Sequence, residues 1–203
     1  MLEKAEIKMS KQDKYKQRKF EFLEEKIASE TPFRGRVFQV ELAQVRLPDG
    51  SKSSREIVHH FGGACVVALD SDRNLYLVEQ YRISPGLEML ELPAGKLEKD
   101  EDHLLCARRE AREELGVTAG DWQLLTEFYP TPGYSSELIK IYLVRNIKLG
   151  KNKLDPGEFL RVKQIPLEDA VHMVMTGEII DAKTIIGILL TEKLLGEAGR
   201  DTD

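Results

Sequence analysis

The sequence predicts a mixed α/β protein, α+β in arrangement, in which a mixed β-sheet lies between helices and an antiparallel hairpin precedes it. Short runs of alternating apolar and polar residues fill much of the first hundred positions, which is typical of strands. An apolar period of 3.6 residues appears only later, once in the middle of the chain and twice near its end. With 203 residues, 41% of them apolar, the chain is long enough for one domain with a sizeable core.

The N-terminal third is predicted to contain a tail and a hairpin. Residues 1–30 mix both charge signs with few apolar anchors, so we expect a charged tail or a solvated helix. Residues 33–42 alternate as a strand does, and the turn-forming residues 48–50 follow. Residues 54–60 are then the returning strand of the hairpin.

The central strands follow the hairpin. Residues 64–69 and 75–81 are β-rich runs separated by a short polar segment, so we expect them to pair as a second hairpin inside the sheet. Another strand is expected over residues 87–92, where Pro-Ala-Gly stops it. Strand character returns in residues 138–144 and, more weakly, in residues 159–165.

Three segments have the period of an amphipathic helix. The first covers residues 101–115 and ends at Gly116, a residue type that commonly terminates helices. Beyond Pro166, residues 167–175 and 182–195 combine apolar stripes with good helix formers. The order of strands, one helix, strands and two helices contains no internal repeat.

Composition excludes several classes of protein. The 30 basic and 35 acidic residues give a net charge of −5, which disfavours nucleic acid as a partner. No apolar run is long enough to cross a membrane, and the N-terminus lacks a secretory signal, so a cytoplasmic location is expected. Cys65 and Cys106 form no C-x-x-C pair and are interpreted as small apolar residues. His59 and His60 are neighbours on a strand and face opposite sides, so they are assigned no metal.

Three carboxylates crowd one face of the first helix. Glu110, Glu113 and Glu114 stand at positions i, i+3 and i+4, where like charges repel one another. Hard divalent cations such as Mg²⁺ bind through a few carboxylates together with substrate phosphates, which suits this cluster. The alternative is a solvated helix face that pairs with the arginines of the same helix.

Residues 95–117 fit the pattern G-x5-E-x7-R-E-U-x-E-E-x-G-U, where U is apolar, without a gap. The segment therefore resembles the Nudix box, and the chain resembles a Nudix hydrolase. Ala111 is the one soft departure, since a bulkier apolar residue is common there, and it leaves the carboxylates intact. The matching positions are Gly95, Glu101, Arg109, Glu110, Glu113, Glu114, Gly116 and Val117.

The resemblance implies a Nudix fold and a site for Mg²⁺, for which Mn²⁺ can substitute. It makes Glu110 and Glu114 metal ligands, and it makes Glu113 a third ligand, an outer partner or a catalytic group. The carbonyl of Ala94 would complete the site. It further implies that Arg109 and Glu101 form an ion pair that orients the helix carboxylates.

Segments outside the box resemble the ADP-ribose pyrophosphatase subfamily. Pro132 lies in one of them, residues 128–137, although an ordinary turn would explain it as well. The subfamily implies that Arg55 and Arg82 contact substrate, whereas a surface ion pair is the alternative for Arg82. It also implies an aromatic residue against the adenine, and Phe33 is the candidate.

The adenine contact has alternatives within the same hairpin. Phe33 and Phe38 are its aromatic residues, and at least one of them is expected to face the core. If neither stacks on the base, Arg36 or Arg55 could lie over it through a cation–π contact.

The subfamily also implies a general base on a mobile loop before the late strand. Here that loop is residues 149–158, with Gly150 and Gly157 as flexible points. Glu158 is the candidate base and Asp155 the reserve. The alternative is that Glu158 is a solvated loop acid.

Together these residues predict Mg²⁺-dependent cleavage of ADP-ribose, and of related nucleoside diphosphate sugars, to AMP and ribose 5-phosphate or the matching sugar phosphate. The alternatives are a GDP-mannose or other nucleotide-sugar hydrolase and a catalytically silent nucleotide-binding module. The expected organisation is a tail or helix in residues 1–30, a hairpin region for dimerisation and substrate binding in residues 31–62, and a Nudix domain in residues 63–198. We expect a homodimer.

Overall fold

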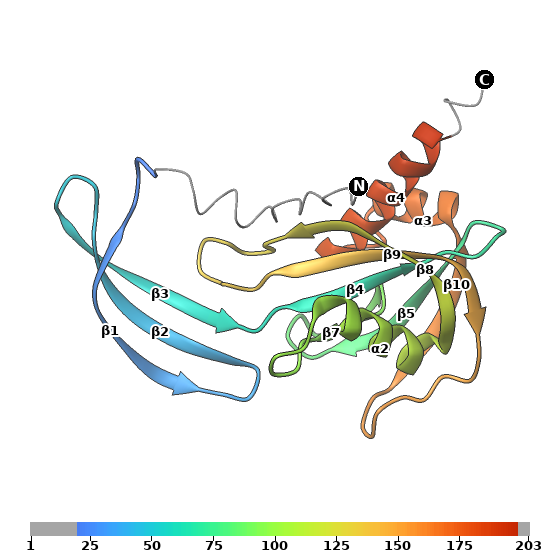
Figure 1. The fold of residues 1–203 in the computed structure, drawn as a ribbon, viewed down its shortest axis with the longest axis horizontal. Helices are drawn as coiled ribbons and strands as arrows, with labels where there is room; N and C mark the ends of the chain where they lie inside the picture. Colours follow the sequence, from blue (N-terminus) through green and yellow to red (C-terminus); the bar gives the residue numbers. More distant parts are fainter. Residues whose placement is uncertain (1–19, 199–203) are drawn as a thin grey trace, which may run out of the picture.

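The computed structural model describes residues 20–198, which contain ten strands and three helices (Figure 1). The strands are β1 (Glu25–Arg34), β2 (Phe38–Arg46), β3 (Lys52–His60), β4 (Gly63–Ala68), β5 (Asn74–Arg82), β6 (Leu87–Glu91), β7 (Ala94–Lys96), β8 (Val117–Phe128), β9 (Ile139–Leu149) and β10 (Leu160–Pro166). The helices are α2 (His103–Leu115), α3 (Leu167–Thr176) and α4 (Ala182–Ala198). The chain therefore has the predicted order of strands, helix, strands and helices.

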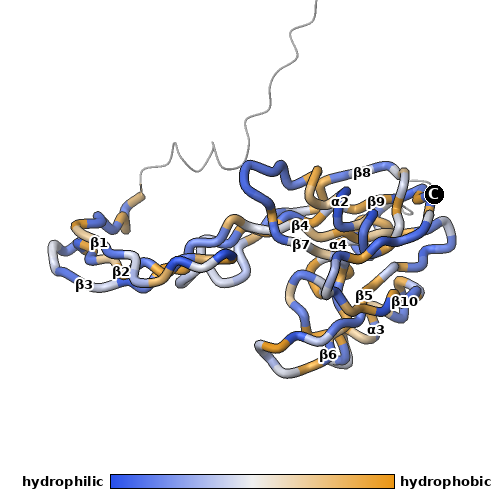
Figure 2. The backbone as a smooth tube through the Cα atoms, turned by 90° about the horizontal axis from the view of Figure 1, so that it is seen from below, coloured by the Kyte–Doolittle hydropathy of each residue, from blue (hydrophilic) through white to orange (hydrophobic). Residues whose placement is uncertain are grey.

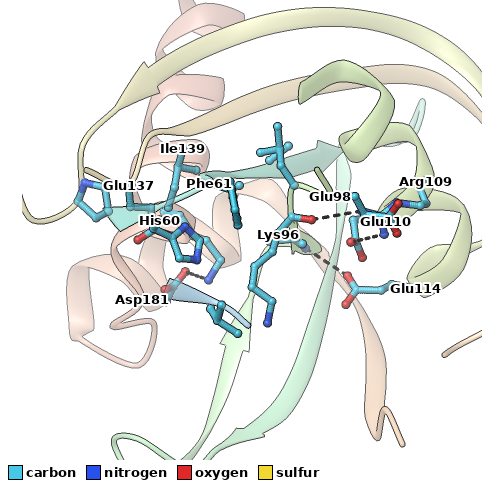
Figure 3. Close-up of a pocket in the computed structure, with 18 of the residues that line it drawn as sticks. His60, Phe61, Lys96, Glu98, Arg109, Glu110, Glu114, Glu137, Ile139 and Asp181 are labelled. Atoms are coloured by element: carbon cyan, nitrogen blue, oxygen red, sulfur yellow. Dashed lines mark hydrogen bonds and ion pairs between the residues drawn. The ribbon is translucent and has the colours of Figure 1, made fainter. Parts of the chain in front are cut away.

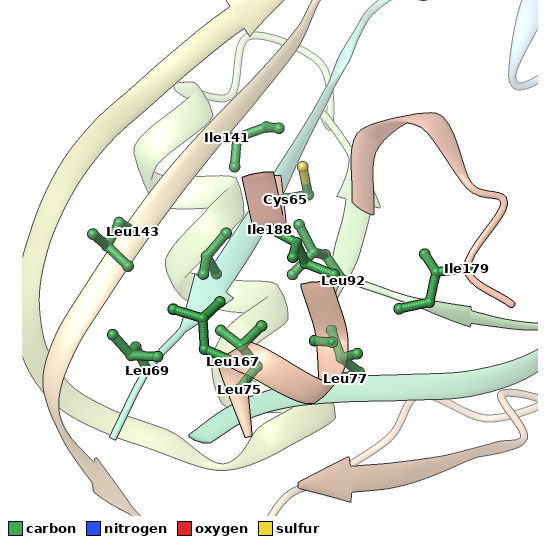
Figure 4. Close-up of a cluster of buried hydrophobic side chains, with 12 residues drawn as sticks. Cys65, Leu69, Leu75, Leu77, Leu92, Ile141, Leu143, Leu167, Ile179 and Ile188 are labelled. Atoms are coloured by element: carbon green, nitrogen blue, oxygen red, sulfur yellow. The ribbon is translucent and has the colours of Figure 1, made fainter. Parts of the chain in front are cut away.

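The body of the protein is the predicted sandwich, in which β4 is buried on both faces. One sheet has the order β7-β4-β9-β8, with β4 and β9 parallel, and a second has the order β10-β5-β6. Cys65 and Val67 of β4 pack toward α3 and α4, within the apolar cluster drawn in Figure 4. Ala64 and Val66 point the other way and pack against α2. This alternation places α2 on one side of the sheet and α3 and α4 on the other.

The N-terminal region is a three-stranded antiparallel sheet that stands away from the body (Figures 1 and 2). The predicted hairpin is present as β2 and β3, but the first strand was placed too early, since residues 35–37 separate β1 from β2. Residues 25–30 belong to β1, so for them the prediction of a tail or helix is wrong. The part of that prediction covering residues 1–19 lies outside the described residues. Residues 25–30 form a strand because they pair with β2, and the few apolar residues of this segment did not indicate that pairing.

The predicted hairpin between residues 64–69 and 75–81 is also wrong. Its two strands diverge into different sheets and share only an isolated bridge between Leu69 and Leu75. Both strands are buried runs that find their partners elsewhere in the chain, β4 with β7 and β9, and β5 with β6 and β10. The polar residues between the two strands predicted a tight turn of the chain here, but a turn does not determine which strands pair.

Both ends of α2 have the capping expected of a stable helix. The Asp102 side chain accepts the backbone N–H of Leu104 at 2.8 Å, which starts the helix two residues later than predicted. Gly116 ends it in the left-handed conformation with φ of 76°. Cys65 and Cys106 are buried free thiols, and burial raises the pKa of each to about 12, as expected of apolar core residues. Between residues 20 and 198, no helix is both long and apolar enough to span a bilayer.

Candidate active site

A cavity of about 710 Å³ opens where the N-terminal sheet meets the body (Figure 3). Segments that are far apart in the sequence converge on it, namely the end of β3, the strand β7, α2, the loop before β10 and the start of α4. Six of the predicted site residues line it, and so does the reserve base Asp155. The six are Arg82, Ala94, Arg109, Glu110, Glu114 and Glu158.

Glu110 and Glu114 are almost buried at the cavity wall, with exposed fractions of 8% and 3%. One helical turn separates them, so both carboxylates project on the same side of α2. Gly95 lies against Glu110 so closely that a Cβ built there would fall 1.6 Å from Glu110 Oε1. The backbone N–H of Ala94 donates to Glu114 Oε2 at 3.2 Å. The strand β7 thus cradles both acids.

Arg109 connects the remaining acids of the box. Its Nε and Nη2 both donate to Glu101, each at 3.1 Å, and Nη1 donates to Glu110 at 2.6 Å and to Glu113 at 3.2 Å. The carboxylates of Glu101 and Glu110 hold the pKa of Arg109 above its usual value. The predicted ion pair of Arg109 and Glu101 is therefore present. Glu113 faces Arg109 and is absent from the lining of the cavity.

The two buried acids are electrostatically unfavourable in the absence of a cation. Burial raises the pKa of Glu114 to about 8, and the nearby carboxylates of Glu110 and Glu158 act in the same direction. Burial also raises the pKa of Glu110, which Arg109 only partly opposes. Two acids buried at the wall of an open cavity are therefore suited to a cation that would restore their charged forms.

The donor set fits a magnesium ion with few protein ligands. Within residues 20–198, no three His, Cys, Asp or Glu side chains are arranged closely enough to hold a metal by themselves. Glu110 and Glu114 supply two carboxylates, while Glu113 turns to Arg109 instead. Mg²⁺ commonly takes one or two carboxylates and completes its shell with water and substrate phosphates. The pair is therefore compatible with Mg²⁺, and the carbonyl of Ala94 stays a predicted ligand.

Arg82 lines the cavity and is held by a buried acid. Its Nε and Nη2 donate to the two oxygens of Glu91 at 2.7 and 2.9 Å, a bidentate pair. The hydrogen bonds of Glu91 raise the pKa of Arg82, and coulombic attraction to Glu114 contributes. Glu91 also pairs with Lys183, 92 residues later in the chain. Arg82 is therefore in an ion pair, as the alternative expected, but its partner is buried at 1% exposure and the pair lies at the cavity wall.

The start of α4 anchors the segment that cradles the acids. Asp181 accepts the backbone N–H of Thr184 at 3.0 Å and pairs with Lys183 at 2.9 Å. The hydroxyl of Thr184 is fully buried and accepts the backbone N–H of Leu92 at 2.8 Å. This contact ties α4 to the β6–β7 connection. Residues 181–184, Asp-Ala-Lys-Thr, therefore support the site.

The loop that carries Glu158 is fastened at one end to α2. The backbone N–H of Lys153 donates to the carbonyl of Glu113 at 2.9 Å, and the side chain of Asn152 donates to the carbonyl of Glu114 at 3.2 Å. Glu158 Oε2 accepts the backbone N–H of Asp155 at 3.3 Å. Glu158 raises the pKa of both Glu110 and Glu114, so it lies within electrostatic reach of the acids.

Three predicted substrate residues do not line the cavity of their own chain. Arg55 pairs with Glu24 through Nε at 2.9 Å, within the N-terminal part of the chain. The Phe33 ring packs against that of Phe38, with 5.5 Å between centroids. Pro132 is exposed in the β8–β9 loop, where Pro130 lines the cavity instead. Within one chain, Arg55, Phe33 and Pro132 are therefore not brought to the acids.

Sequence reasoning missed several residues of the cavity wall. His60 was assigned no metal and Lys183 was given no role in the site, yet both line the cavity. Phe61 was not considered at all, and it is 64% exposed there. The glycines at positions 62 and 63 were a signal for Phe61, because they mark a break between strands at which a side chain leaves the sheet.

Gly95 provides the first test of this geometry. Gly95→Ala would bring a methyl group against the Glu110 carboxylate and displace that carboxylate. The kcat/KM of a reaction that depends on Glu110 should therefore fall about 100-fold or more. Gly196→Ala on α4 is the matched control, because a Cβ there meets no atom within 4 Å. Steady-state kinetics and thermal unfolding of both variants would check this. Wild-type kcat/KM in Gly95→Ala would disprove the cradle.

Comparison with known proteins identifies the family of this chain. The family model described as the NUDIX domain matches residues 59–185, which include every cavity residue of the body that binds or orients the acids. The chain belongs to the Nudix family.

Relatives of this Nudix chain cover most of its length. It is 40% identical over 169 residues to the ADP-ribose pyrophosphatase of Bacillus subtilis (strain 168), covering 82% of this chain and 91% of the relative. It is 36% identical over 169 residues to the methanol dehydrogenase activator of Bacillus methanolicus, with the same coverage. A solved structure described as an ADP compounds hydrolase superposes with a TM-score of 0.76 at 22% identity, covering 87% of this chain and 96% of that one. That likeness supports the Nudix fold.

Proposed function

We propose that this Nudix chain hydrolyses the diphosphate linkage of ADP-ribose to AMP and ribose 5-phosphate, in a Mg²⁺-dependent reaction. The observation that carries the proposal is the pair of buried acids, Glu110 and Glu114, at a cavity that also receives Arg82 and Glu158. The similarity to an ADP-ribose pyrophosphatase supports the choice of substrate. Mn²⁺ is expected to substitute for Mg²⁺, and the expected location in the cell is the cytoplasm.

Each protein group has a defined part in this proposal. Arg82, fixed by Glu91, would bind a phosphate oxygen of the substrate and orient the diphosphate. Glu110 and Glu114 would hold Mg²⁺, which supplies charge neutralisation of the diphosphate when bound. Glu158 would accept the proton of the attacking water, and its loop would carry it toward the acids. Arg109 keeps Glu110 and Glu113 oriented.

Product identification tests the proposal. The protein would be incubated with Mg²⁺ and, separately, ADP-ribose, GDP-mannose, UDP-glucose, NADH and diadenosine polyphosphates, and the products resolved by chromatography. AMP and ribose 5-phosphate should form from ADP-ribose, and a chelator should abolish their formation. Turnover of GDP-mannose without turnover of ADP-ribose would overturn the substrate and leave the Nudix assignment standing.

Two alternatives are separated by the same experiment. A GDP-mannose or other nucleotide-sugar hydrolase would use the same acids on a substrate with a different nucleobase. Nothing in the acid cluster selects the nucleobase. A silent binding module would yield no product from any substrate of the panel. The presence of Glu110, Glu113 and Glu114 argues against the silent module.

We further propose a homodimer built on the N-terminal sheet. The sheet stands away from the body and leaves large apolar side chains exposed, including Phe33, Phe38 and Val37. Burying such side chains against a second copy would be favourable. Arg55 and Phe33 lie outside the cavity of their own chain and would reach substrate only from a partner. Sedimentation should give a dimer at micromolar concentration, and an active monomer would refute it.

Mixed dimers provide a sharper test of the shared site. Arg55→Ala and Glu114→Gln would each be inactive alone if Arg55 acts across the interface. Coexpression in equal amounts should restore about a quarter of wild-type activity, because half of the dimers would then carry one intact site out of two. No recovery in the mixture would place Arg55 outside the partner's site.

A further inference from the structure

A buried acid beside the cavity is shared by two cations. Glu91, at the end of β6, is 1% exposed, and its two oxygens accept hydrogen bonds from Arg82 at 2.7 and 2.9 Å. Lys183, at the start of α4, donates to the same carboxylate, and it lines the cavity as Arg82 does. Burial alone would raise the pKa of Glu91, but the hydrogen bonds of Arg82 and the charge of Lys183 lower it. Glu91 is therefore a charged group that needs compensation.

Arg82 keeps one donor nitrogen for a ligand. Its Nε and Nη2 are occupied by Glu91, whereas Nη1 donates to no acceptor within residues 20–198. The hydrogen bonds of Glu91 contribute most to the raised pKa of Arg82, and the charges of Asp181 and Glu114 also contribute. Arg82 is thus within electrostatic reach of the metal-binding acids. Its Nη1 is the group that a phosphate beside those acids would contact.

The charge of Arg82 is available to a phosphate only if Glu91 is neutralised from elsewhere. Arg82 and Glu91 form a bidentate pair whose two charges cancel at short range. Lys183 adds a second positive charge to the same carboxylate. The three groups together therefore carry one net positive charge at the cavity wall.

Lys183 is itself held by the protein. Its side chain is 14% exposed, and its ammonium group pairs with Asp181 at 2.9 Å as well as with Glu91. Burial alone would lower the pKa of Lys183, but the charges of Asp181 and Glu91 raise it. Asp181 in turn accepts the backbone N–H of Thr184 at 3.0 Å, so the N-terminus of α4 stabilises its charge. Lys183 is therefore engaged by two acids, and its charge acts on the cavity through Glu91.

We infer that Lys183 is a positioning residue, which neutralises Glu91 and so leaves Arg82 with the positive charge that binds the diphosphate of the substrate. The inference rests on the proposed function, which places the diphosphate beside the acids and Arg82. A lysine 92 residues after Glu91 thus sets the affinity of an arginine with which it shares a carboxylate.

Calorimetry with ADP and with adenosine tests this, because only ADP carries a diphosphate. Lys183→Met removes the charge and nearly keeps the length of the side chain, so it should weaken ADP binding about tenfold and leave adenosine binding unchanged. Lys193→Met is the matched control, since Lys193 lies on the same helix, pairs with Glu197 at 2.9 Å and does not line the cavity. The KM for ADP-ribose should rise about tenfold in Lys183→Met, with kcat within about twofold of wild type.

A double variant distinguishes action through Glu91 from direct contact. Glu91→Gln removes the negative charge that Lys183 neutralises, so on that background Lys183→Met should change ADP affinity by less than about twofold. A tenfold loss on both backgrounds would show that Lys183 contacts the ligand itself, and would overturn the inference. Lys183→Gln should behave as Lys183→Met, and Lys183→Arg, which keeps the charge, should bind ADP within about threefold of wild type. Thermal unfolding would check that each variant is folded.

The outcomes separate this inference from the proposed function. Unchanged ADP affinity in Lys183→Met, or equal weakening of ADP and adenosine, would overturn the inference even if the wild type hydrolyses ADP-ribose. ADP binding that depends on the charge of Lys183, in a protein that leaves ADP-ribose intact, would overturn the substrate and retain the inference.

Discussion

Glu114→Gln is expected to lower kcat by about 1,000-fold or more at saturating Mg²⁺ while the protein stays folded. The amide has nearly the volume of the carboxylate and can still accept the N–H of Ala94. It lacks the negative charge that would hold the cation, so the loss falls on metal binding and catalysis. Because the position is only 3% exposed, replacing a buried acid with a neutral group should not weaken the fold.

Two measurements would check the role of Glu114. Kinetics over a Mg²⁺ titration report turnover, and the shift of the unfolding temperature on adding Mg²⁺ reports binding independently of activity. The wild type should be stabilised by the ion and Glu114→Gln should not. Glu113→Gln is the matched control and should lose less activity, since Glu113 faces Arg109. Wild-type kcat in Glu114→Gln would show that Glu114 is not a metal ligand.

Glu158→Gln is expected to lower kcat by roughly 10²- to 10⁴-fold with little change in KM, the usual share of acid–base catalysis. The amide oxygen can still accept the N–H of Asp155, so the turn that shapes the loop is preserved. What the variant loses is the capacity to accept a proton from water. The expected change is therefore in the chemical step and not in substrate binding.

Asp155→Asn is the matched control for the loop, because it removes the other acid that lines the cavity from the same segment. Glu158→Gln and Asp155→Asn would be compared by steady-state kinetics under identical Mg²⁺ concentrations. A loss below about fivefold in Glu158→Gln would assign the base to Asp155 or to a glutamate of α2 such as Glu113. A larger loss in Asp155→Asn than in Glu158→Gln would favour the reserve candidate.

The sequence by itself determined the broad order of strands and helices and the content of the acid cluster, although it assigned no strand to most of β1 or to β8. Both are local properties, since an amphipathic period and a capping residue depend on positions a few residues apart. The face shared by Glu110 and Glu114 follows from helical spacing alone. The pairing of Arg109 with Glu101 is nearly as local, because eight residues of one loop and helix connect them.

Only the tertiary structure decided which distant segments meet. β4 and β5 do not form the predicted hairpin, because their backbone edges pair with β9 and β10 instead, contacts that no local pattern specifies. Arg82 and Glu91 lie nine residues apart on the paired strands β5 and β6, but Lys183, which completes their network, lies 92 residues after Glu91, where no local pattern connects it to them. The turn at Gly62 and Gly63 is likewise held by backbone hydrogen bonds to Leu138 and Leu97, which lie next to β9 and β7. Long-range packing thus brought these distant segments together, whereas the spacing of the two acids within one helix already followed from the sequence.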